Sequence, residues 1–328
     1  MNNGKIRVAV LYGGRSGEHE ISVRSAASVV AAMDPAKYEV TRIFITPEGR
    51  WNPRPILPEP GANPGIDVVF PVLHGTFGED GTVQGLLELA GLAYVGAGVL
   101  ASAVSMDKEV TKRLCRERGL PVVECVVVTR GCLSAEEVER KLAYPVFVKP
   151  ANLGSSVGIS KARNREELDD ALRLASRFDR KVIVEREIVG REIECSVLGN
   201  QEPQASVPCE ILPSREFYDY EDKYLLDKAE TVLPADLPRE TADEVRRLAV
   251  ECYRAVECEG MARVDFLIET ATDSVYINEI NTIPGFTSIS MYPKMWEATG
   301  IPYPALIDRL IDLALDRHAA RRATRFER

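Results

Sequence analysis

The chain has 328 residues, of which 45% are hydrophobic and 28% are charged, a composition typical of a globular protein with two or three domains. A net charge of −9 argues against broad nucleic-acid binding, and no apolar stretch approaches the roughly 20 residues that a membrane-spanning helix needs. The seven cysteines form no CxxC pair and the N-terminus lacks a signal-peptide pattern, so we expect reduced thiols in a cytoplasmic protein that binds neither membrane nor nucleic acid.

The first hundred residues predict a doubly wound α/β domain. Residues 5–12 form a near-continuous apolar run, typical of a parallel strand buried on both faces. Loops at the carboxyl ends of the predicted strands contain Glu18 and His74, where ligands bind in such sheets. Gly13-Gly14 lacks the spacing of a dinucleotide-binding fingerprint, and Gly96-x-Gly98 follows a late strand instead of opening the βαβ unit, so tight turns explain these glycines. Strands are predicted at residues 5–12, 38–45, 66–75 and 92–96, and helices at 21–33 and 82–91.

The middle of the chain predicts a second unit with features suited to phosphate. A helix over residues 106–118 is expected to be capped by Ser105, and Lys108 stands in its first turn, where a cation is unfavourable unless an anion is near. The loop 151–158, ANLGSSVG, has the backbone and hydroxyl composition of a phosphate cradle, although such loops are more often only hairpins. Lys149 ends the preceding strand and could reach the same phosphates. Further strands are predicted at 123–129, 145–150 and 181–188, and helices at 134–143 and 165–178.

Residues 185–192 and 214–230 contain charged and aromatic side chains, for which the sequence alone allows more than one role. Glu185, Arg186 and Glu192 could hydrogen-bond adenine and ribose at a hinge, but surface charge explains them better on the sequence alone. Residues 214–230 are aromatic, charged and without clear period, which favours a mobile lid with Lys223 and Tyr224 at its tip. Amphipathic helices are predicted at 239–257 and 303–322.

Residues 262–290 are the most informative stretch. In residues 262–269 apolar side chains alternate with polar ones, as in a strand, and the same period predicts that Ile277, Glu279 and Asn281 share one face of a second strand. Pairing the two strands can bring Asp265, Glu279 and Asn281 together as hard oxygen ligands that suit Mg²⁺. Arg263 lies on the same face as Asp265. A polar strand face exposed to water is the alternative.

Several motifs follow one another in an order that resembles the D-alanine–D-alanine ligases of the ATP-grasp superfamily. The resemblance extends from residue 5 to about residue 310, and the motifs NEINTIPGFT and VKPANLGSSVG together make the fold assignment specific. The motifs are GGRSGEHEIS, LHGTFGEDGTVQG, MDK, VKPANLGSSVG, FYDYEDKY, ARVDF and NEINTIPGFTSIS.

The resemblance implies an ATP-grasp fold of α/β and α+β type with three domains. These are an N-terminal doubly wound domain with the first D-alanine site at residues 1–107, a central ATP-grasp subdomain at 108–188, and a C-terminal subdomain with the metal site and lid at 189–328. The implied reaction joins two D-alanines for peptidoglycan synthesis. A carboxylate attacks the γ-phosphate of ATP to give an acylphosphate, and the second amine then displaces phosphate. A homodimer is also expected.

The resemblance also assigns roles to individual residues. Two Mg²⁺ would be held by Asp265, Glu279 and Asn281, Mn²⁺ could substitute, and a monovalent cation could take part. Glu18 would bind the first D-alanine and form a latch with Ser155 and Tyr224, while His74 would sit near the acylphosphate. The oxyanion would be stabilised by Arg263 and the Gly285 N–H, and Ser290 would bind the second carboxylate. ATP would contact Lys108, Lys149, Ser156, Glu185, Arg186, Ile188, Glu192 and Lys223.

Three alternatives stay open at this point. The second substrate could be D-serine or another small amino acid, whereas Tyr224 in the lid argues against a D-lactate-using relative. A nucleotide-binding regulatory module without catalysis would be expected to have lost part of the charged set that this chain keeps. An NAD-dependent oxidoreductase would need a GxGxxG motif after the first strand. Arg186 stands where the family often has Lys, and residues 196–217 are short beside some relatives.

Overall fold

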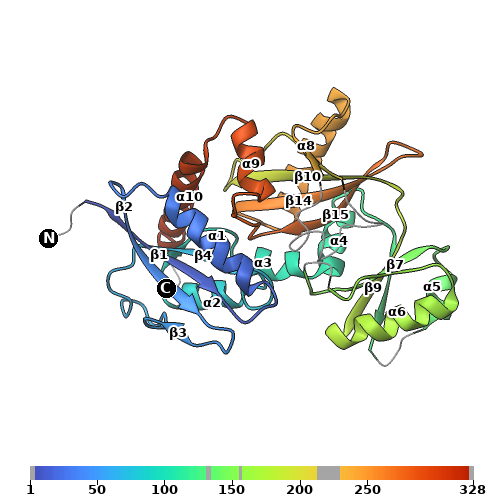
Figure 1. Ribbon diagram of the computed structural model, residues 1–328, viewed down its shortest axis with the longest axis horizontal. Helices are drawn as coiled ribbons and strands as arrows, with labels where there is room; N and C mark the ends of the chain where they lie inside the picture. The colour runs from blue at the N-terminus through green and yellow to red at the C-terminus, as the bar shows by residue number, and fades with distance from the viewer. Residues whose placement is uncertain (1–3, 131–133, 155–156, 213–229, 325–328) are drawn as a thin grey trace.

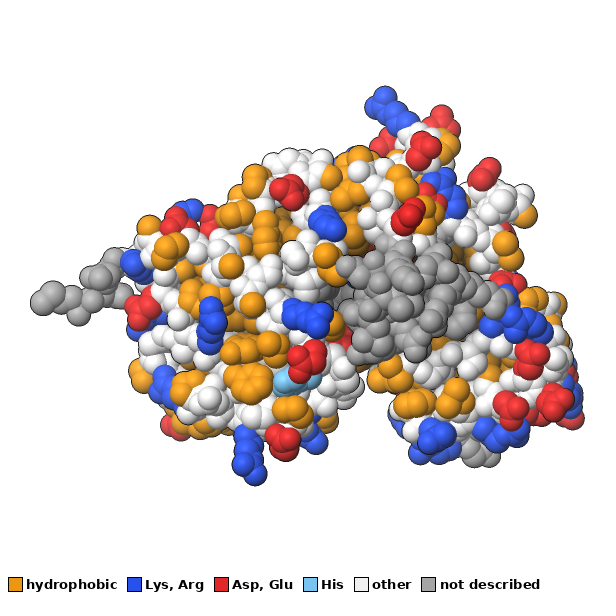
Figure 2. Space-filling view, in the orientation of Figure 1, with side chains coloured by type: hydrophobic (Ala, Val, Ile, Leu, Met, Phe, Trp, Pro, Cys, Tyr) orange, Lys and Arg blue, Asp and Glu red, His pale blue; other side chains and the backbone are white. Residues whose placement is uncertain are grey.

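A computed structural model describes residues 4–130, 134–154, 157–212 and 230–324. Three sheets organise this part of the chain, as Figure 1 shows. On the visible face in Figure 2, basic and acidic side chains are interspersed over the described surface. No helix in the described ranges is long and apolar enough to cross a membrane. The six described cysteines are free thiols, as predicted, and Cys132 lies outside the described residues.

The first sheet is the predicted α/β sheet, with the strand order β3-β2-β1-β4-β5. β1, β2, β4 and β5 are parallel, whereas β3 pairs antiparallel with β2. All five residues of β4 are buried, as the apolar runs of this region lead one to expect. The loops after β1 and β4 contain Glu18 and His74, as predicted. The elements are β1 (Ile6–Gly13), α1 (His19–Ala32), β2 (Tyr38–Ile45), β3 (Trp51–Asn52), β4 (Val68–Val72), α2 (Thr82–Leu89), β5 (Ala93–Tyr94) and α3 (Val99–Met106).

The C-terminal helix packs against this first sheet. α10 (Tyr303–Arg322) contacts α1, β4 and β5, and lies beside α1 in Figure 1. One core cluster therefore joins Val8 and Phe70 of the sheet to Leu310 of α10. The buried Arg317 donates to the carbonyl oxygen of Tyr94 at 2.8 Å. The C-terminal helix α10 therefore belongs to the same packed unit as the first sheet. The domain boundaries at residues 107 and 188 stay a prediction.

The central sheet is antiparallel, with the order β6-β9-β7-β8. α5 and α6 bury apolar residues in one core with this sheet, and α6 has the predicted bounds. The predicted cap Ser105 is wrong, because Ser105 is buried within α3 and the chain turns only at Asp107. The Asp107 side chain accepts from the backbone N–H groups of Glu109 and Val110, so it caps α4. The elements are α4 (Lys108–Glu117), β6 (Cys125–Thr129), α5 (Ala135–Glu139), β7 (Val146–Pro150), β8 (Ser160–Ala162), α6 (Arg165–Phe178) and β9 (Lys181–Arg186).

The third sheet is antiparallel with the order β13-β12-β10-β14-β15, and β11 pairs with β10. α8 packs on β10, β14 and β15 over a second core. The predicted lid at residues 214–230 lies almost wholly outside the described residues. The elements are β10 (Gly190–Gly199), β11 (Gln204–Ala205), β12 (Cys209–Leu212), β13 (Glu230–Val232), α8 (Arg239–Ala255), β14 (Gly260–Glu269), β15 (Val275–Asn281) and α9 (Met291–Ala298).

A bulge in β15 corrects the predicted faces of this strand. β14 alternates between buried and half-buried residues as expected. Asp265 pairs with Glu279, but Phe266 pairs with Ile277, so Asn278 is the extra residue. The prediction that Ile277 and Glu279 share a face is therefore wrong: Ile277 is buried in the core, whereas Glu279 lies opposite Asp265. The bulge keeps the strand apolar inside and polar toward the site.

Candidate active site

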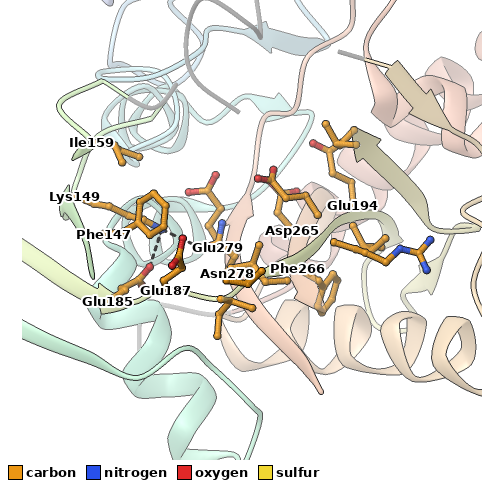
Figure 3. A pocket seen from close by; sticks show the side chains of 18 of the residues that line it. Phe147, Lys149, Ile159, Glu185, Glu187, Glu194, Asp265, Phe266, Asn278 and Glu279 are labelled. Carbon is orange, nitrogen blue, oxygen red and sulfur yellow. Dashed lines mark hydrogen bonds and ion pairs between the residues drawn. The ribbon is translucent and has the colours of Figure 1, made fainter. Parts of the chain in front are cut away.

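A pocket of about 670 Å³ lies between the central and third sheets. Figure 3 shows Lys149 and Glu185 on one side and Asp265 and Glu279 on the other. Eight of the residues predicted for ATP and metal line it, namely Lys108, Lys149, Glu185, Arg186, Ile188, Glu192, Asp265 and Glu279. β7 and β9 therefore supply one wall of a shared pocket, and β10, β14 and β15 supply the other.

The acidic end of the pocket is built on the paired strands β14 and β15. Asp265 accepts two hydrogen bonds from Arg263, from Nε at 2.7 Å and from Nη2 at 2.6 Å. The Asn281 amide donates to Asp265 Oδ2 at 3.1 Å, and Glu194 of β10 lies 3.3 Å from Arg263 Nε. Burial would lower the pKa of Arg263, but Asp265 and Glu194 outweigh burial and raise it above its usual value. Three predicted residues thus form one hydrogen-bonded group.

Lys108 joins the acidic end to the glycine-containing loop after β7. Its Nζ lies 3.1 Å from Glu279 Oε2 and donates to the carbonyl oxygen of Leu153 at 2.8 Å. Its backbone N–H donates to the carbonyl oxygen of Ala151 at 3.0 Å. The unfavourable cation in the first turn of α4 therefore has an anion nearby, as its position suggested.

A second cationic group holds the opposite wall. Glu185 of β9 lies 2.7 Å from the Lys149 ammonium through Oε2 and 2.9 Å from the Lys112 ammonium through Oε1. Burial alone would raise the pKa of Glu185, but the two lysines lower it to about 2. Burial lowers and Glu185 raises the pKa of Lys149, and the net direction is upward. Glu185 and Lys149 are therefore both charged at neutral pH.

The hinge between β9 and β10 forms the far end of the pocket. The Arg186 guanidinium lies 2.6 Å from Glu269 Oε1 and stacks over the Tyr276 ring, 5.1 Å from its centroid. Its side chain thereby ties β9 to β14 and β15. Ile188 lines the pocket within the turn before β10, and Glu192 lines it from β10 itself.

The loops of the first sheet approach the loop after β15. His74 is buried, and its Nδ1 lies 3.0 Å from the Ile283 carbonyl oxygen, an acceptor to which it must donate. Its Nε2 therefore accepts from Ser25 Oγ at 3.2 Å, and Ser25 accepts from the Phe286 N–H. Burial lowers the pKa of His74, so the ring is neutral. His74 thus holds the Gly285 loop against α1.

Glu18 lies near both the loop after β4 in the first sheet and the glycine-containing loop after β7, which we call the central loop. A Cβ placed on Gly75 would lie 2.6 Å from Glu18 Oε2, and one on Gly154 would lie 3.7 Å from it. In the loop after β15, Ser290 Oγ accepts from the Thr287 N–H at 3.0 Å. A Cβ on Gly285 would lie 2.7 Å from the same oxygen. Glu18 therefore borders the loops after β4 and β7, whereas Ser290 borders Gly285 within the loop after β15.

Some predicted site residues cannot be placed. Ser155, Ser156, Lys223 and Tyr224 lie outside the described residues. Among described residues, no group of three or more His, Cys, Asp or Glu side chains is arranged to hold a metal ion. The predicted metal ligands Asp265, Glu279 and Asn281 do not form such a group, because only two of them are carboxylates and the third is an amide. Its hard oxygen donors on facing strands fit the chemistry of Mg²⁺.

Sequence reasoning missed three residues of this site. Lys112 lies one turn after Lys108 and shares the buried face of α4 with Thr111 and Cys115, which is an unusual place for a lysine. Asn278 accepts from Lys149 at 3.3 Å because the bulge turns it toward the pocket. Glu79 accepts from the Gly75 N–H, and burial together with the charge of Glu18 raises its pKa to about 8. Only Lys112 left a sequence signal, a cation at helical spacing on an apolar face.

Two antiparallel sheets around a pocket lined by lysines and paired carboxylates define an ATP-grasp protein. Residues 114–312 match the family described as D-ala D-ala ligase C-terminus. Residues 7–64 and 57–97 match the family described as D-ala D-ala ligase N-terminus. The chain therefore belongs to the D-alanine–D-alanine ligase family, and the predicted fold class and resemblance are confirmed.

Individual relatives agree with this assignment over nearly their whole length. A D-alanine–D-alanine ligase of Solibacter usitatus is 70% identical over 324 residues, which cover 99% of this chain and 100% of the relative. The structure of the D-alanine–D-alanine ligase from Coxiella burnetii matches with a TM-score of 0.87 at 40% identity, over 97% of this chain and 96% of that one. The VanG D-Ala:D-Ser ligase from Enterococcus faecalis also has a TM-score of 0.87, at 36% identity, over 94% and 99% of the two chains.

Proposed function

We propose that this chain joins two D-alanines to D-alanyl-D-alanine with hydrolysis of ATP to ADP and phosphate, and so supplies peptidoglycan synthesis. One observation carries the proposal: Lys108 and Lys149 line one pocket with Asp265 and Glu279, and Arg263 hydrogen-bonds to Asp265, in a chain of this family. Lysines opposite paired carboxylates suit a polyphosphate with its metal. Phosphoryl transfer needs little covalent help, so placement and charge supply the catalysis.

In the proposed first step the carboxylate of one D-alanine attacks the γ-phosphate, and ADP leaves. Lys108 and Lys149 offset the charge that develops on the phosphate oxygens, together with Lys223 and the Ser156 hydroxyl. Glu18 holds the ammonium of the first D-alanine, and its place between Gly75 and Gly154 puts it between the first sheet and the central loop. Ser155 and Tyr224 close the latch over it.

In the proposed second step the amine of the other D-alanine attacks the acylphosphate carbonyl, and phosphate leaves. Arg263 and the Gly285 N–H donate to the oxyanion, which is the charge that forms only in this transition state. Ser290 binds the second carboxylate. His74 acts near the acylphosphate as a neutral ring, because its two nitrogens are already engaged by Ile283 and Ser25.

The metal site belongs to the same proposal. Asp265, Glu279 and Asn281 would hold two Mg²⁺, or Mn²⁺ in their place, and the bound ions would offset the negative charge of the phosphates. Glu185, Arg186, Ile188 and Glu192 would surround the adenosine, with Arg186 acting through its backbone, since its guanidinium is bound to Glu269. We also propose the three-domain division at residues 107 and 188, a homodimer, and a cytoplasmic location.

A second candidate is a ligase that takes D-serine as its second substrate. The similarity in fold to a D-Ala:D-Ser ligase, at a TM-score of 0.87, favours testing it. The Tyr224 lid and the higher identity to D-alanine–D-alanine ligases favour the dipeptide of D-alanine.

The test is phosphate release by the purified protein with ATP and Mg²⁺. D-alanine, L-alanine, D-serine and D-lactate are added in turn, first alone and then each of the other three together with D-alanine, and the product mass is measured alongside. Release that requires D-alanine and gives its dipeptide supports the proposal. Release that requires D-alanine together with D-serine supports the second candidate. ATP binding without release under any of these conditions would overturn both and favour a nucleotide-binding module without catalysis.

A further inference from the structure

Lys112 is a buried cation that the proposed reaction does not use. It lies on α4, and only 1% of its side chain is exposed. Its Nζ lies 2.9 Å from Glu185 Oε1, and it is not among the described residues that line the pocket. Burying an ammonium is costly, and an apolar side chain of similar volume is often at least as stabilising in such a place. Core packing alone therefore does not account for Lys112.

Glu185 connects Lys112 to the pocket. One of its oxygens is held by Lys112, and the other lies 2.7 Å from Lys149 Nζ. Lys149 is also fixed from β15, because its Nζ donates to Asn278 Oδ1 at 3.3 Å. β9 and β15 thus set two of the three N–H directions of the Lys149 ammonium, and the third meets no acceptor among the described residues, so it can turn to a ligand in the pocket.

Lys112, Glu185 and Lys149 form a row of charges that explains what Lys112 contributes. Glu185 alone would cancel the charge of Lys149, and the pair would attract a polyphosphate weakly. With Lys112 behind Glu185, the row of two cations and one anion keeps a net positive charge next to the pocket. Only 12% of the Lys149 side chain is exposed, so solvent screens its charge less than that of a fully exposed lysine.

We propose that Lys112 is a positioning residue, which neutralises and orients Glu185 so that Lys149 keeps its charge for the phosphates of the nucleotide. The inference rests on the proposed ATP site. It goes beyond that site because Lys112 contacts Glu185 and acts only through it.

The test compares Lys112→Met with wild type and with Arg113→Met, a change in the neighbouring, exposed residue of the same helix. Binding of Mg-ADP is measured by calorimetry, and the KM values for ATP and D-alanine and the kcat are measured by phosphate release. We expect Lys112→Met to weaken Mg-ADP and raise the KM for ATP at least about tenfold, as for loss of one partner of a buried charge pair. The KM for D-alanine should stay unchanged, and Lys112→Arg should restore most of the affinity.

A double-mutant cycle separates this role from simple support of the fold. In a Glu185→Gln background, adding Lys112→Met should change Mg-ADP affinity little, because the group through which Lys112 acts is gone. Mg-ADP affinity within about twofold of wild type in Lys112→Met, or an equal loss in both backgrounds, overturns the proposal. If Lys112→Met alone does not fold, the comparison of Glu185→Gln with and without it decides the question. Mg-ADP binding needs no ligase activity, so a failed proposed function is recognised separately, by wild-type protein that binds nucleotide but forms no dipeptide.

Discussion

Arg263 offers the sharpest test of the active-site geometry. Its guanidinium spans both oxygens of Asp265 and also lies 3.3 Å from Glu194, with only 18% of the side chain exposed. Arg263→Ala removes a donor expected at the oxyanion, a loss that costs about 10²–10³ in rate. It also leaves two carboxylates without their shared cation, which should lower the free energy of unfolding by about 3 kcal/mol, as for other broken buried pairs. The Asn281 amide still donates to Asp265 and limits that loss.

The assay is steady-state phosphate release with dipeptide detection, and urea unfolding of the same preparations. Because the oxyanion exists only in the transition state, kcat should fall far more than the KM for ATP rises. Arg7→Ala is the matched control, since Arg7 makes a similar two-oxygen contact with Asp67 in the first sheet, away from the pocket. Turnover of folded Arg263→Ala within about threefold of wild type would refute the assignment of Arg263 to the oxyanion.

Three further predictions concern the first-substrate region. Tyr224→Phe should lower activity without changing thermal unfolding, and unchanged kinetics would remove the latch. Gly75→Ala should raise the KM for the first D-alanine, because the new Cβ would lie 2.6 Å from Glu18 Oε2; Gly61→Ala, with a similar positive φ and no described atom within 4 Å, is its control, and equal kinetics in the two would contradict the reasoning. Burial and Glu18 raise the pKa of Glu79 from 4.5 to about 8, so its contribution to stability is complete below pH 4.5 and is lost as the pH rises through 8. Glu79→Gln should therefore flatten the fall in unfolding free energy between about pH 4.5 and pH 8, and an unaltered slope would show that the carboxyl does not titrate there.

Local patterns predicted the elements that local forces determine. The helix α6 was predicted to the residue because Asn164 caps it and its apolar period is unbroken. The cap of α4 was missed because α3 and α4 follow each other closely, and Ser105 and Asp107 are both capping residue types. Only the turn at Asp107, set by packing of α3, decides between them.

The parts of the site that the sequence left hidden depend on contacts between distant segments. The strand period placed Asp265 opposite Glu279, but the bulge at Asn278 arises from pairing with β14 and has no signature in the alternation. The link between Lys112 and Glu185 joins a helix to a strand 73 residues later, which a pattern in one segment cannot indicate. Periodicity predicts which face of a helix or strand a residue occupies. An ion pair can be predicted only when the position of the partner residue is also known.

The carboxylates expected to hold metal are the same groups that hold the cations expected to meet phosphate. Asp265 binds Arg263, and Glu279 binds Lys108. Entry of a metal–nucleotide complex into this pocket would therefore be an exchange of partners, with cations turning to phosphate as carboxylates turn to metal. No buried charge need be left unpaired during that exchange, which avoids the large penalty for an isolated buried ion.

Glu185 differs from those two carboxylates, because the proposed mechanism gives it no metal. When the third N–H of Lys149 binds phosphate, the Lys149 charge is shared between two anions, and Glu185 would lose part of its compensation unless another cation stayed beside it. Lys112, buried and 2.9 Å from the other oxygen of Glu185, is that cation. The exchange argument therefore predicts a permanent cation behind Glu185, and it accounts for a lysine on the buried face of α4, where packing would favour an apolar side chain.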